Sequence, residues 1–572
     1  MLWRLTLALT IAGWLAGTGC VDGADRGPAV ERWRIAEIVF HSQREYSNPT
    51  RDVRLDVTFT QGGRRIARPA FWDGGDVWKV RFAPPDAGTW QYGTECSDRQ
   101  NARLHGRSGR LRCVPYRGDN PLYAHGFLRV SDDRRRLVHA DGTAFFWLGD
   151  THWMGPDNES VSACNHPVHK DKPCPHGGAF QHVVHDRKAK GFSVYQMYPH
   201  VQAGYYWSGE YAGLDPARFR DVFDPMMDHL AENGFVVALG LGHWAAPKAM
   251  KAEDLKLFAR YVVARYGAHP VVWITAQEAD MNDQVGGVWK AVAEEIRRAD
   301  GYPHPLSYHQ RVGVTTTWWA QPWHDWACAQ GGHRNSGLRS QSDYRRFWDH
   351  KPTKPWLEGE SMYEGMTACG GPHATAEVRH AAWKSILCGS FGYTYGGSGI
   401  WLFGGDAEGV KRNQWIDHPW YDGMDLPGST QMGHLKRFFL GMNDWSRLTP
   451  RWAGKAWGQW AHPEESVIAT VGREVFIVYF YGAGVATGTL KGLDPSTTYI
   501  ARWFDPRLGA YKAIADGIRS SDGAWRVPER PDRQDWVLIL EANRQAESQS
   551  ASLRPEGATG WVGPADPPIP TV

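Results

Sequence analysis

Two glutamates that each end an apolar run could share acid–base chemistry. Residues 271–278, Val-Val-Trp-Ile-Thr-Ala-Gln-Glu, end in Glu278, and residues 354–360, Lys-Pro-Trp-Leu-Glu-Gly-Glu, end in Glu360. Breaking a glycosidic bond takes two carboxyl groups on either side of that bond. One donates a proton, and the other attacks carbon or activates water. We predict that Glu278 and Glu360 form such a catalytic pair.

Glu358 is the alternative for the second acid, because it lies in the same run as Glu360. Side chains alternate along a strand, and we expect only one of these two glutamates to face a pocket. We prefer Glu360, because it lies nearer the C-terminal end of the run and Tyr363 and Glu364 follow it. Glu358 would then support the site from behind, or be the catalyst itself.

Polar and aromatic residues also stand at or after the other apolar runs. His, Asp, Gln and Tyr side chains can bind sugar hydroxyls, and indole rings can stack on sugar faces. The chain has 30 Trp. We expect Trp153, Trp244 and Trp401 to be the ones that stack, whereas most of the others fill cores. The predicted substrate-binding residues are Asp150, His152, Trp153, His200, His243, Trp244, Gln277, His309, Gln330, Tyr363, Glu364, Tyr395 and Trp401.

The elements that must position these residues are eight strand-like runs separated by amphipathic helical stretches. This alternation over residues 117–447 predicts a (β/α)8 TIM barrel, in which functional residues gather at the C-terminal ends of the strands. A doubly wound sheet is the alternative, but no Gly-rich phosphate loop follows the first run. The predicted strands are residues 145–150, 192–198, 236–241, 271–275, 306–309, 326–330, 356–360 and 392–395.

Two flanking regions have a different pattern, with short alternating strands broken by turns. Residues 27–116 and residues 448–545 are each predicted to form a β-sandwich. Residues 546–572 are rich in Ser, Pro and Gly and are predicted to be a disordered tail. The predicted fold class is therefore multidomain, a TIM barrel flanked by two β-sandwich domains.

Residues 1–20 have the features of an export signal. Arg4 precedes a short apolar stretch, and small residues lead to Cys20. Cys20 resembles the lipid-attachment residue of bacterial lipoproteins, so a lipid anchor is one expectation and free secretion the other. The expected location is thus the periplasm, the outer membrane as a lipoprotein, or the exterior.

Composition excludes some partners and cofactors. Lys and Arg number 64 against 62 Asp and Glu, so a bulk basic surface for nucleic acid is not expected. Cys164 and Cys174 lie in a His-rich stretch that could bind zinc, but a disulfide is favoured in an exported protein. Cys96 and Cys113 could also pair, whereas Cys388 is expected to be a buried free thiol. We predict no cofactor and no metal. No sequence feature indicates an oligomeric state.

Several motifs resemble those of the apiosidase-like proteins of glycoside hydrolase family 140. Residues 147–153 are similar to the first barrel strand of that family, and Arg187 to Phe192 resemble its lead into the second. Residues 355–360 with Tyr363 and Glu364 resemble its seventh strand, which carries a catalytic Glu. A further resemblance is to the stretch that leads through the family's eighth strand. It rests on Arg379, Trp383, Gly392-Tyr-Thr-Tyr-Gly396 and Trp401.

The resemblance implies a sandwich–barrel–sandwich order, with a C-terminal domain of the type labelled collagen-binding. It also implies a retaining mechanism, with Glu360 as nucleophile, Glu278 as acid/base, Asp150 in the sugar pocket and the Gln277 amide on a sugar 2-hydroxyl. The family commonly ends its fourth strand in Gly-Gly-Asp, where this sequence has Ala276-Gln277-Glu278. The resemblance therefore implies a glycosidase of plant or algal glycans more firmly than any one sugar.

Two other functions are compatible with the same residues. A carbohydrate-binding protein with an inactive barrel would keep the Trp residues but would lose an acid, and both acids are present. A polysaccharide lyase could use the His and Tyr residues as base and acid. A lyase product absorbs ultraviolet light and a hydrolase product does not.

Overall fold

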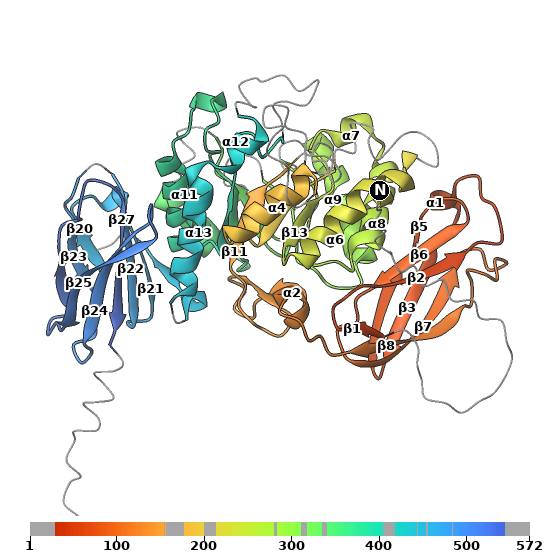
Figure 1. Ribbon diagram of the computed structural model, residues 1–572, viewed down its shortest axis with the longest axis horizontal. Helices are drawn as coiled ribbons and strands as arrows, with labels where there is room; N and C mark the ends of the chain where they lie inside the picture. The colour runs from red at the N-terminus through yellow and green to blue at the C-terminus, as the bar shows by residue number, and fades with distance from the viewer. Residues whose placement is uncertain are drawn as a thin grey trace, which may run out of the picture.

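The computed structural model describes residues 29–153, 155, 177–199, 213–278, 283–310, 317–333, 340–403, 418–442, 444–452, 456–482 and 484–543. The predicted signal segment and tail, Cys164, Cys174 and His200 lie outside these residues. A barrel lies between two β-rich domains, the N-terminal one at the right of Figure 1 and the C-terminal one at the left. The predicted fold class is confirmed.

The N-terminal domain consists of a five-stranded sheet, in the order β1-β8-β7-β3-β4, and a three-stranded sheet, β2-β6-β5. Its strands form because apolar and polar residues alternate, so that one face packs into a shared core. Phe59 and Phe82 stack across that core with ring centroids 3.9 Å apart. The elements are β1 (Ala29–Glu31), β2 (Ala36–His41), α1 (Pro49–Asp52), β3 (Leu55–Gln61), β4 (Arg64–Pro69), β5 (Phe71–Trp72), β6 (Val77–Phe82), β7 (Gly88–Cys96) and β8 (Ser108–Val114).

Cys96 and Cys113, which the sequence allowed to pair, are both free and buried thiols. Strand register explains why they do not pair. Cys113 on β8 is paired with Gly88 at the start of β7, whereas Cys96 ends β7. The two residues are therefore separated by the length of β7, roughly 27 Å at about 3.4 Å per residue. Cys388 is a buried free thiol, as predicted.

Eight parallel strands form the barrel, in the order β15-β14-β13-β12-β11-β18-β17-β16. A bridge between His309, just after β15, and Cys328 in β16 brings the two ends of this sheet together. Each predicted strand occurs, most of them shorter than expected by one or two residues. The strands are β11 (Trp147–Thr151), β12 (Val194–Met197), β13 (Val236–Gly240), β14 (Val271–Ile274), β15 (Leu306–Ser307), β16 (Ala327–Gln330), β17 (Trp356–Glu360) and β18 (Gly392–Tyr395).

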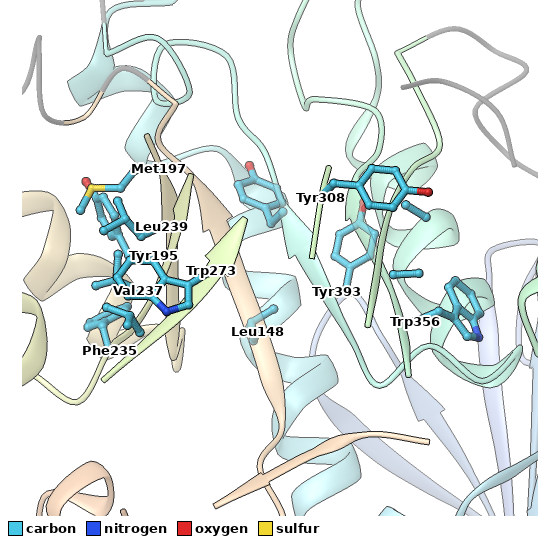
Figure 2. Packing of buried hydrophobic residues seen from close by; sticks show 14 of the residues in the cluster. Leu148, Tyr195, Met197, Phe235, Val237, Leu239, Trp273, Tyr308, Trp356 and Tyr393 are labelled. Carbon is cyan, nitrogen blue, oxygen red and sulfur yellow. The ribbon is translucent and has the colours of Figure 1, made fainter. Parts of the chain in front are cut away.

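Alternate residues of these strands pack in two separate cores. Trp147, Val272 and Leu357 belong to the core inside the barrel. Leu148, Trp273 and their neighbours belong to a larger core between the strands and the surrounding helices, part of which Figure 2 shows. The strands are thus buried on both faces, as is usual for parallel sheets.

Helices surround the barrel, and a short hairpin follows the N-terminal domain. The hairpin is β9 (Leu128–Val130) with β10 (Leu137–His139), after α2 (Pro121–Ala124). The helices are α4 (Ala179–Ala189), α5 (Pro216–Arg218), the π-helix η4 (Phe219–Phe223), α6 (Asp224–Glu232), α7 (Ala246–Ala249), α8 (Ala252–Tyr266), α9 (Asp283–Ala299), α10 (Gln341–Asp349), α11 (Thr375–Leu387), α12 (Trp420–Met424) and α13 (Pro427–Leu440), with 3₁₀ turns η6 (Ala368–Gly370) and η7 (Trp445–Arg447).

The C-terminal domain has a six-stranded sheet, β19-β21-β22-β27-β24-β25, and a three-stranded sheet, β20-β23-β26. One face of the larger sheet joins the core beneath the barrel helices, through Val467, Ile477 and Val537. Its elements are β19 (Thr449–Arg451), β20 (Gly458–Trp460), η8 (Pro463–Glu465), β21 (Ser466–Val471), β22 (Val475–Phe480), β23 (Gly488–Lys491), β24 (Tyr499–Asp505), β25 (Ala510–Ile518), β26 (Ala524–Val527) and β27 (Trp536–Ala542).

Buried ion pairs fasten both flanking domains to the barrel. Asp224 of α6 is within 2.7 Å of Arg81 from the N-terminal domain and of Arg265 from α8. Arg379 of α11 donates to Asp535 of the C-terminal domain at 2.7 Å. Because an unpaired buried charge is costly, these pairs favour one fixed arrangement of the three domains.

Among the described residues, no helix combines the length and the apolar character that a membrane crossing would require.

Candidate active site

A β-bulge at the end of β17 separates Glu358 from Glu360. In a regular strand, residues two apart share a face, so alternation was the wrong reason to expect the two acids on opposite sides. The register shows the actual cause: Ala329 pairs with Glu358, but the next residue, Gln330, pairs with Glu360, which leaves Gly359 as an extra residue. Bulges of this kind re-aim side chains next to active sites.

The contacts of Glu358 show that it faces the helical layer. Its carboxylate accepts a hydrogen bond from Tyr344 of α10 at 3.2 Å and one from the Gly331 amide at 2.6 Å. Glu358 is fully buried. It therefore has a supporting position behind the strand, and Glu360 is the acid that reaches the barrel mouth.

Glu360 lies among three side chains from neighbouring strand ends. His333 Nε2 is 2.9 Å from its Oε1, and His309 Nε2 is 3.1 Å from its Oε2. Gln277 Nε2 donates to the same Oε2 at 3.4 Å. Burial works against ionisation of this carboxyl, but the contacts with His309 and His333 outweigh burial and hold the pKa of Glu360 well below its usual range. Glu360 is thus a carboxylate at neutral pH.

Glu278 stands just past β14 in an unusual backbone conformation. Its φ is +55°, in the left-handed region, which costs a residue with a side chain roughly 1–2 kcal/mol. Its Oε1 accepts a hydrogen bond from Gln330 Nε2 at 3.1 Å, and the residue is half-buried. Strain of this kind gathers at functional sites, where the surrounding structure maintains it.

The two acids belong to one network at the barrel mouth. Gln330 binds Glu278 and is also the strand partner of Glu360. Gln277, the residue before Glu278, donates to Glu360. Although β15 and β16 lie between β14 and β17, these contacts bring the side chains of Glu278 and Glu360 to the same barrel mouth.

Tyr363 is the centre of an aromatic group beside Glu360. Trp153 Nε1 donates to its hydroxyl at 2.7 Å, and its ring centroid is 4.4 Å from that of His333 and 5.4 Å from that of Trp401. Burial, together with the charge of Glu360, raises the pKa of Tyr363 well above its usual value. Tyr363 therefore remains a neutral phenol that can donate a hydrogen bond.

A row of hydrogen bonds inside the barrel supports this group from below. Trp147 Nε1 donates to Thr394 Oγ1 at 3.0 Å, and Thr394 donates to the Gln196 side chain at 3.2 Å. Gln196 Nε2 then donates to the carbonyl of Gly359 at 2.9 Å, so this row reaches the bulge itself.

Two residues predicted to bind substrate are instead in the outer layer. Asp150 and Tyr395 are strand partners, and each lies two residues after Leu148 or Tyr393 of the helix-facing core, on the same face of its strand. Asp150 accepts a hydrogen bond from Arg187 of α4, which, despite burial, holds the pKa of this carboxyl below its usual value. Asp150 and Tyr395 thus face the helices rather than the barrel mouth, and their part in binding a sugar stays a prediction.

His152 and Glu364 have similar outward positions. His152 stacks on Tyr195 of the outer core at a centroid distance of 3.8 Å and is fully buried. Glu364 accepts a hydrogen bond from Tyr395 at 2.6 Å and is 2% exposed. Neither side chain contacts Glu360 or Glu278 in the described hydrogen bonds.

The three predicted stacking rings differ in exposure. Trp153 is 2% exposed and packs edge-on against His309, so it has no open face for a sugar. Trp401 and Trp244 are half-buried. Lys248 Nζ lies 4.4 Å from the Trp244 ring centroid, and neighbouring His243 is bridged to Gln277. His200 lies outside the described residues.

Sequence reasoning missed two contributors to this site. His333 follows β16 but was not assigned a role, although its position after a barrel strand was a usable signal. Gly359 creates the bulge, and only the Glu-Gly-Glu spacing of residues 358–360 hinted at it. Among the described residues, no cluster of three or more His, Cys, Asp or Glu side chains is arranged to bind a metal ion.

Family comparison agrees with this geometry. The family described as "Apiosidase-like, catalytic domain" matches residues 131–446, more than half of the chain. A domain of unknown function, DUF5060, matches residues 29–97, and "Putative collagen-binding domain of a collagenase" matches residues 457–541. The chain belongs to the apiosidase-like family and is a glycoside hydrolase.

Solved structures share the fold. A protein named "Glycoside hydrolase" has a TM-score of 0.62 at 23% identity, covering 75% of this chain and 99% of that one. A family 5 glycoside hydrolase from Bacteroides vulgatus has a TM-score of 0.60 at 21% identity, covering 74% and 94%. Another B. vulgatus protein, provisionally assigned as a glycoside hydrolase, has a TM-score of 0.65 at 18% identity, covering 90% and 100%. No curated protein sequence matches the chain.

Proposed function

We propose that this glycoside hydrolase is exported and cleaves glycosidic bonds in a plant or algal polysaccharide or oligosaccharide with retention of configuration. The observation that carries the proposal is the pair of acids at the barrel mouth, joined through Gln277 and Gln330. The features of residues 1–20 support export, either to the periplasm or exterior or as a lipoprotein anchored through Cys20.

Glu360 is the proposed nucleophile. Its lowered pKa keeps it ionised, and His309 and His333 hold both of its oxygens. In the first step one of these oxygens bonds to the anomeric carbon as the glycosidic C–O bond breaks. The leaving oxygen takes the proton of the Glu278 carboxyl, so charge does not build up on the departing group.

Glu278 then acts as a base in the second step. Its carboxylate takes a proton from water, and the water oxygen bonds to the anomeric carbon while the bond to Glu360 breaks. This returns both acids to their starting forms, with one water consumed per glycosidic bond. The hydrogen bond from Gln330 orients Glu278 for both proton transfers.

The sugar is bound by the remaining groups at the mouth. Gln277 can donate to the sugar 2-hydroxyl from beside Glu360, and Tyr363 supports these groups from behind, because its buried ring packs against His333. Trp401 and Trp244 are the half-buried rings that can stack on sugar faces. His243, beside Trp244, adds a further hydrogen-bonding group.

The test combines a glycan panel with two variants. Reducing-sugar release from plant and algal glycans identifies a substrate, and absorbance near 230 nm is followed in the same reactions. We expect reducing ends without new absorbance, and losses on the order of 10³-fold or more for Glu360→Gln and Glu278→Gln. Full activity of either variant overturns the assignment, and rising absorbance indicates a lyase.

A further inference from the structure

We propose that Glu364 is a positioning residue. Its carboxylate fixes the turn that carries Tyr363. Through Tyr363 and His333, this turn keeps Glu360 in contact with the two histidines that favour its ionised form. This inference rests on the proposed function, because it requires that Glu360 is the group that reacts.

The carboxylate of Glu364 lies at the start of two helices. The amide of Gly428, in the first turn of α13, donates to Glu364 Oε2 at 2.9 Å and to Oε1 at 3.1 Å. Thr375, the first residue of α11, donates its hydroxyl to Oε1, and Tyr395 donates to Oε2 at 2.6 Å. Helix N-termini carry partial positive charge, so a carboxylate is held more strongly there than a neutral amide would be.

The same donors explain why Glu364 is not a sugar ligand. Both of its oxygens are engaged, and the residue is 2% exposed. A Cβ on Gly428 would come within 2.2 Å of Oε2, so the carboxylate fills the available space. The carboxylate therefore holds the two helix termini and the turn in place, and a sugar hydroxyl would have to displace a helix terminus to reach it.

The backbone of Glu364 is fixed as well. Its amide donates to the Gly396 carbonyl at 3.0 Å, and its carbonyl accepts from Ser398 at 2.8 Å. The next amide, of Gly365, donates to the His373 carbonyl at 3.0 Å. The turn after β17 is thus fastened to the segment after β18 and to the segment before α11.

The contacts of Tyr363 carry this restraint to Glu360. The Tyr363 ring packs so closely on Gly396 that a Cβ there would be 2.0 Å from it. The ring also lies against His333, whose Nε2 is 2.9 Å from Glu360 Oε1. His373, next to the fastened turn, also contacts the backbone carbonyl of His333 through its ring. Loosening of Glu364 would therefore move the groups that hold Glu360 ionised.

The experiment compares Glu364→Gln with two other variants of the full chain. Tyr395→Phe removes one hydrogen bond to Glu364 and keeps the fold testable if Glu364→Gln does not fold. Asp224→Asn is the matched control, because it also weakens a buried carboxylate that bridges elements, but far along the chain from β17. The probe is whichever 4-nitrophenyl glycoside of a panel the wild-type enzyme hydrolyses fastest. The readouts are kcat, KM, the pH profile of kcat/KM, and Tm.

We expect Glu364→Gln to lower kcat at least about tenfold with little change in KM, since small misplacements of reacting groups cost that much or more. The acid limb of kcat/KM should move to higher pH, because Glu360 loses part of the contact that lowers its pKa. Tyr395→Phe should change both quantities in the same direction by less. Asp224→Asn should lower Tm only.

The inference is overturned if Glu364→Gln loses Tm like Asp224→Asn but keeps the wild-type kcat and acid limb. Glu360→Gln, measured with the same probe, distinguishes a failure of the proposed function from a failure of the role proposed for Glu364. Full activity of Glu360→Gln would refute the proposed function and this inference together. An inactive Glu360→Gln beside a normal Glu364→Gln would refute this inference alone.

Discussion

The bulge at Gly359 can be tested by a steric exchange with Cys328. A Cβ placed on Gly359 would lie 2.4 Å from Cys328 Sγ and 3.9 Å from Cys328 Cβ. Cys328 is fully buried in the core inside the barrel, so its thiol has no free space to move into. Gly359→Ala should therefore be overpacked, and Cys328→Ala should create the room that the new methyl group needs.

The magnitude follows from these contacts. Overpacking in a well-packed core costs about 1–3 kcal/mol, and we expect Gly359→Ala to lie near 3 because the overlap exceeds 1 Å. Cys328→Ala alone should cost about 1–2 kcal/mol for the lost sulfur. In the double variant the remaining contacts of the new methyl group, 3.5 Å to the Ala329 carbonyl oxygen and 3.9 Å to the Cβ at position 328, are ordinary packing. The cost of the double variant should therefore be about 2 kcal/mol less than the sum of the two single costs.

The assay is urea unfolding of the four proteins together with kcat on one aryl glycoside. Gly359→Ala should also lose activity, at least about tenfold. Residue 359 directly precedes Glu360, so a shift of its backbone also displaces the catalytic carboxylate. The double variant should recover most of that activity. Gly287→Ala is the control, because nothing lies within 4 Å of a Cβ at that position. Additive unfolding energies, or a double variant as inactive as Gly359→Ala, would refute the bulge as the device that aims Glu360.

Three further outcomes follow from the same geometry. His333→Gln should move the acid limb of kcat/KM to higher pH, since the lowered pKa of Glu360 depends on His333 and the nucleophile works only when ionised; an unchanged limb in a pH-rate profile would contradict this. Glu278→Gln should lose far more activity on 4-nitrophenyl than on 2,4-dinitrophenyl glycosides, because a good leaving group needs no proton; equal losses on both substrates would mean that Glu278 is not the acid. Asp224→Asn should lower the free energy of unfolding by about 3–5 kcal/mol, because Arg81 and Arg265 lose a buried partner; urea unfolding that matches wild type would show that this network is not needed for docking.

The strands of the barrel were predictable because each is a short apolar run with a polar or aromatic residue at its end. Whether the side chain of each end residue points into the barrel or towards the helices was not predictable. Parallel strands buried on both sides carry no alternating pattern, so nothing in the sequence separated the outward Asp150 and Tyr395 from the inward Gln330. The predicted substrate residues therefore divide into two layers that only the register distinguishes.

Glu358 and Glu360 show the same limit at a single bulge. Two glutamates with one residue between them would share a face in a regular strand, and the extra residue that separates them appears only in the pairing with β16. The possible pairing of Cys96 with Cys113 could not be decided for a related reason, because the sequence places both in one domain but does not show that they lie at opposite ends of β7. Long-range register, more than local propensity, was the missing information.

The most direct test of the proposed mechanism is to identify the residue that becomes covalently attached to the sugar. A 2-deoxy-2-fluoro glycoside of the preferred sugar, with a dinitrophenolate leaving group, slows release of the intermediate so that it accumulates. After peptic digestion and mass spectrometry, we expect the added sugar mass on the peptide from β17, with fragmentation placing it on Glu360. A label on Glu358 or Glu278, or turnover without any label, would contradict Glu360 as the nucleophile.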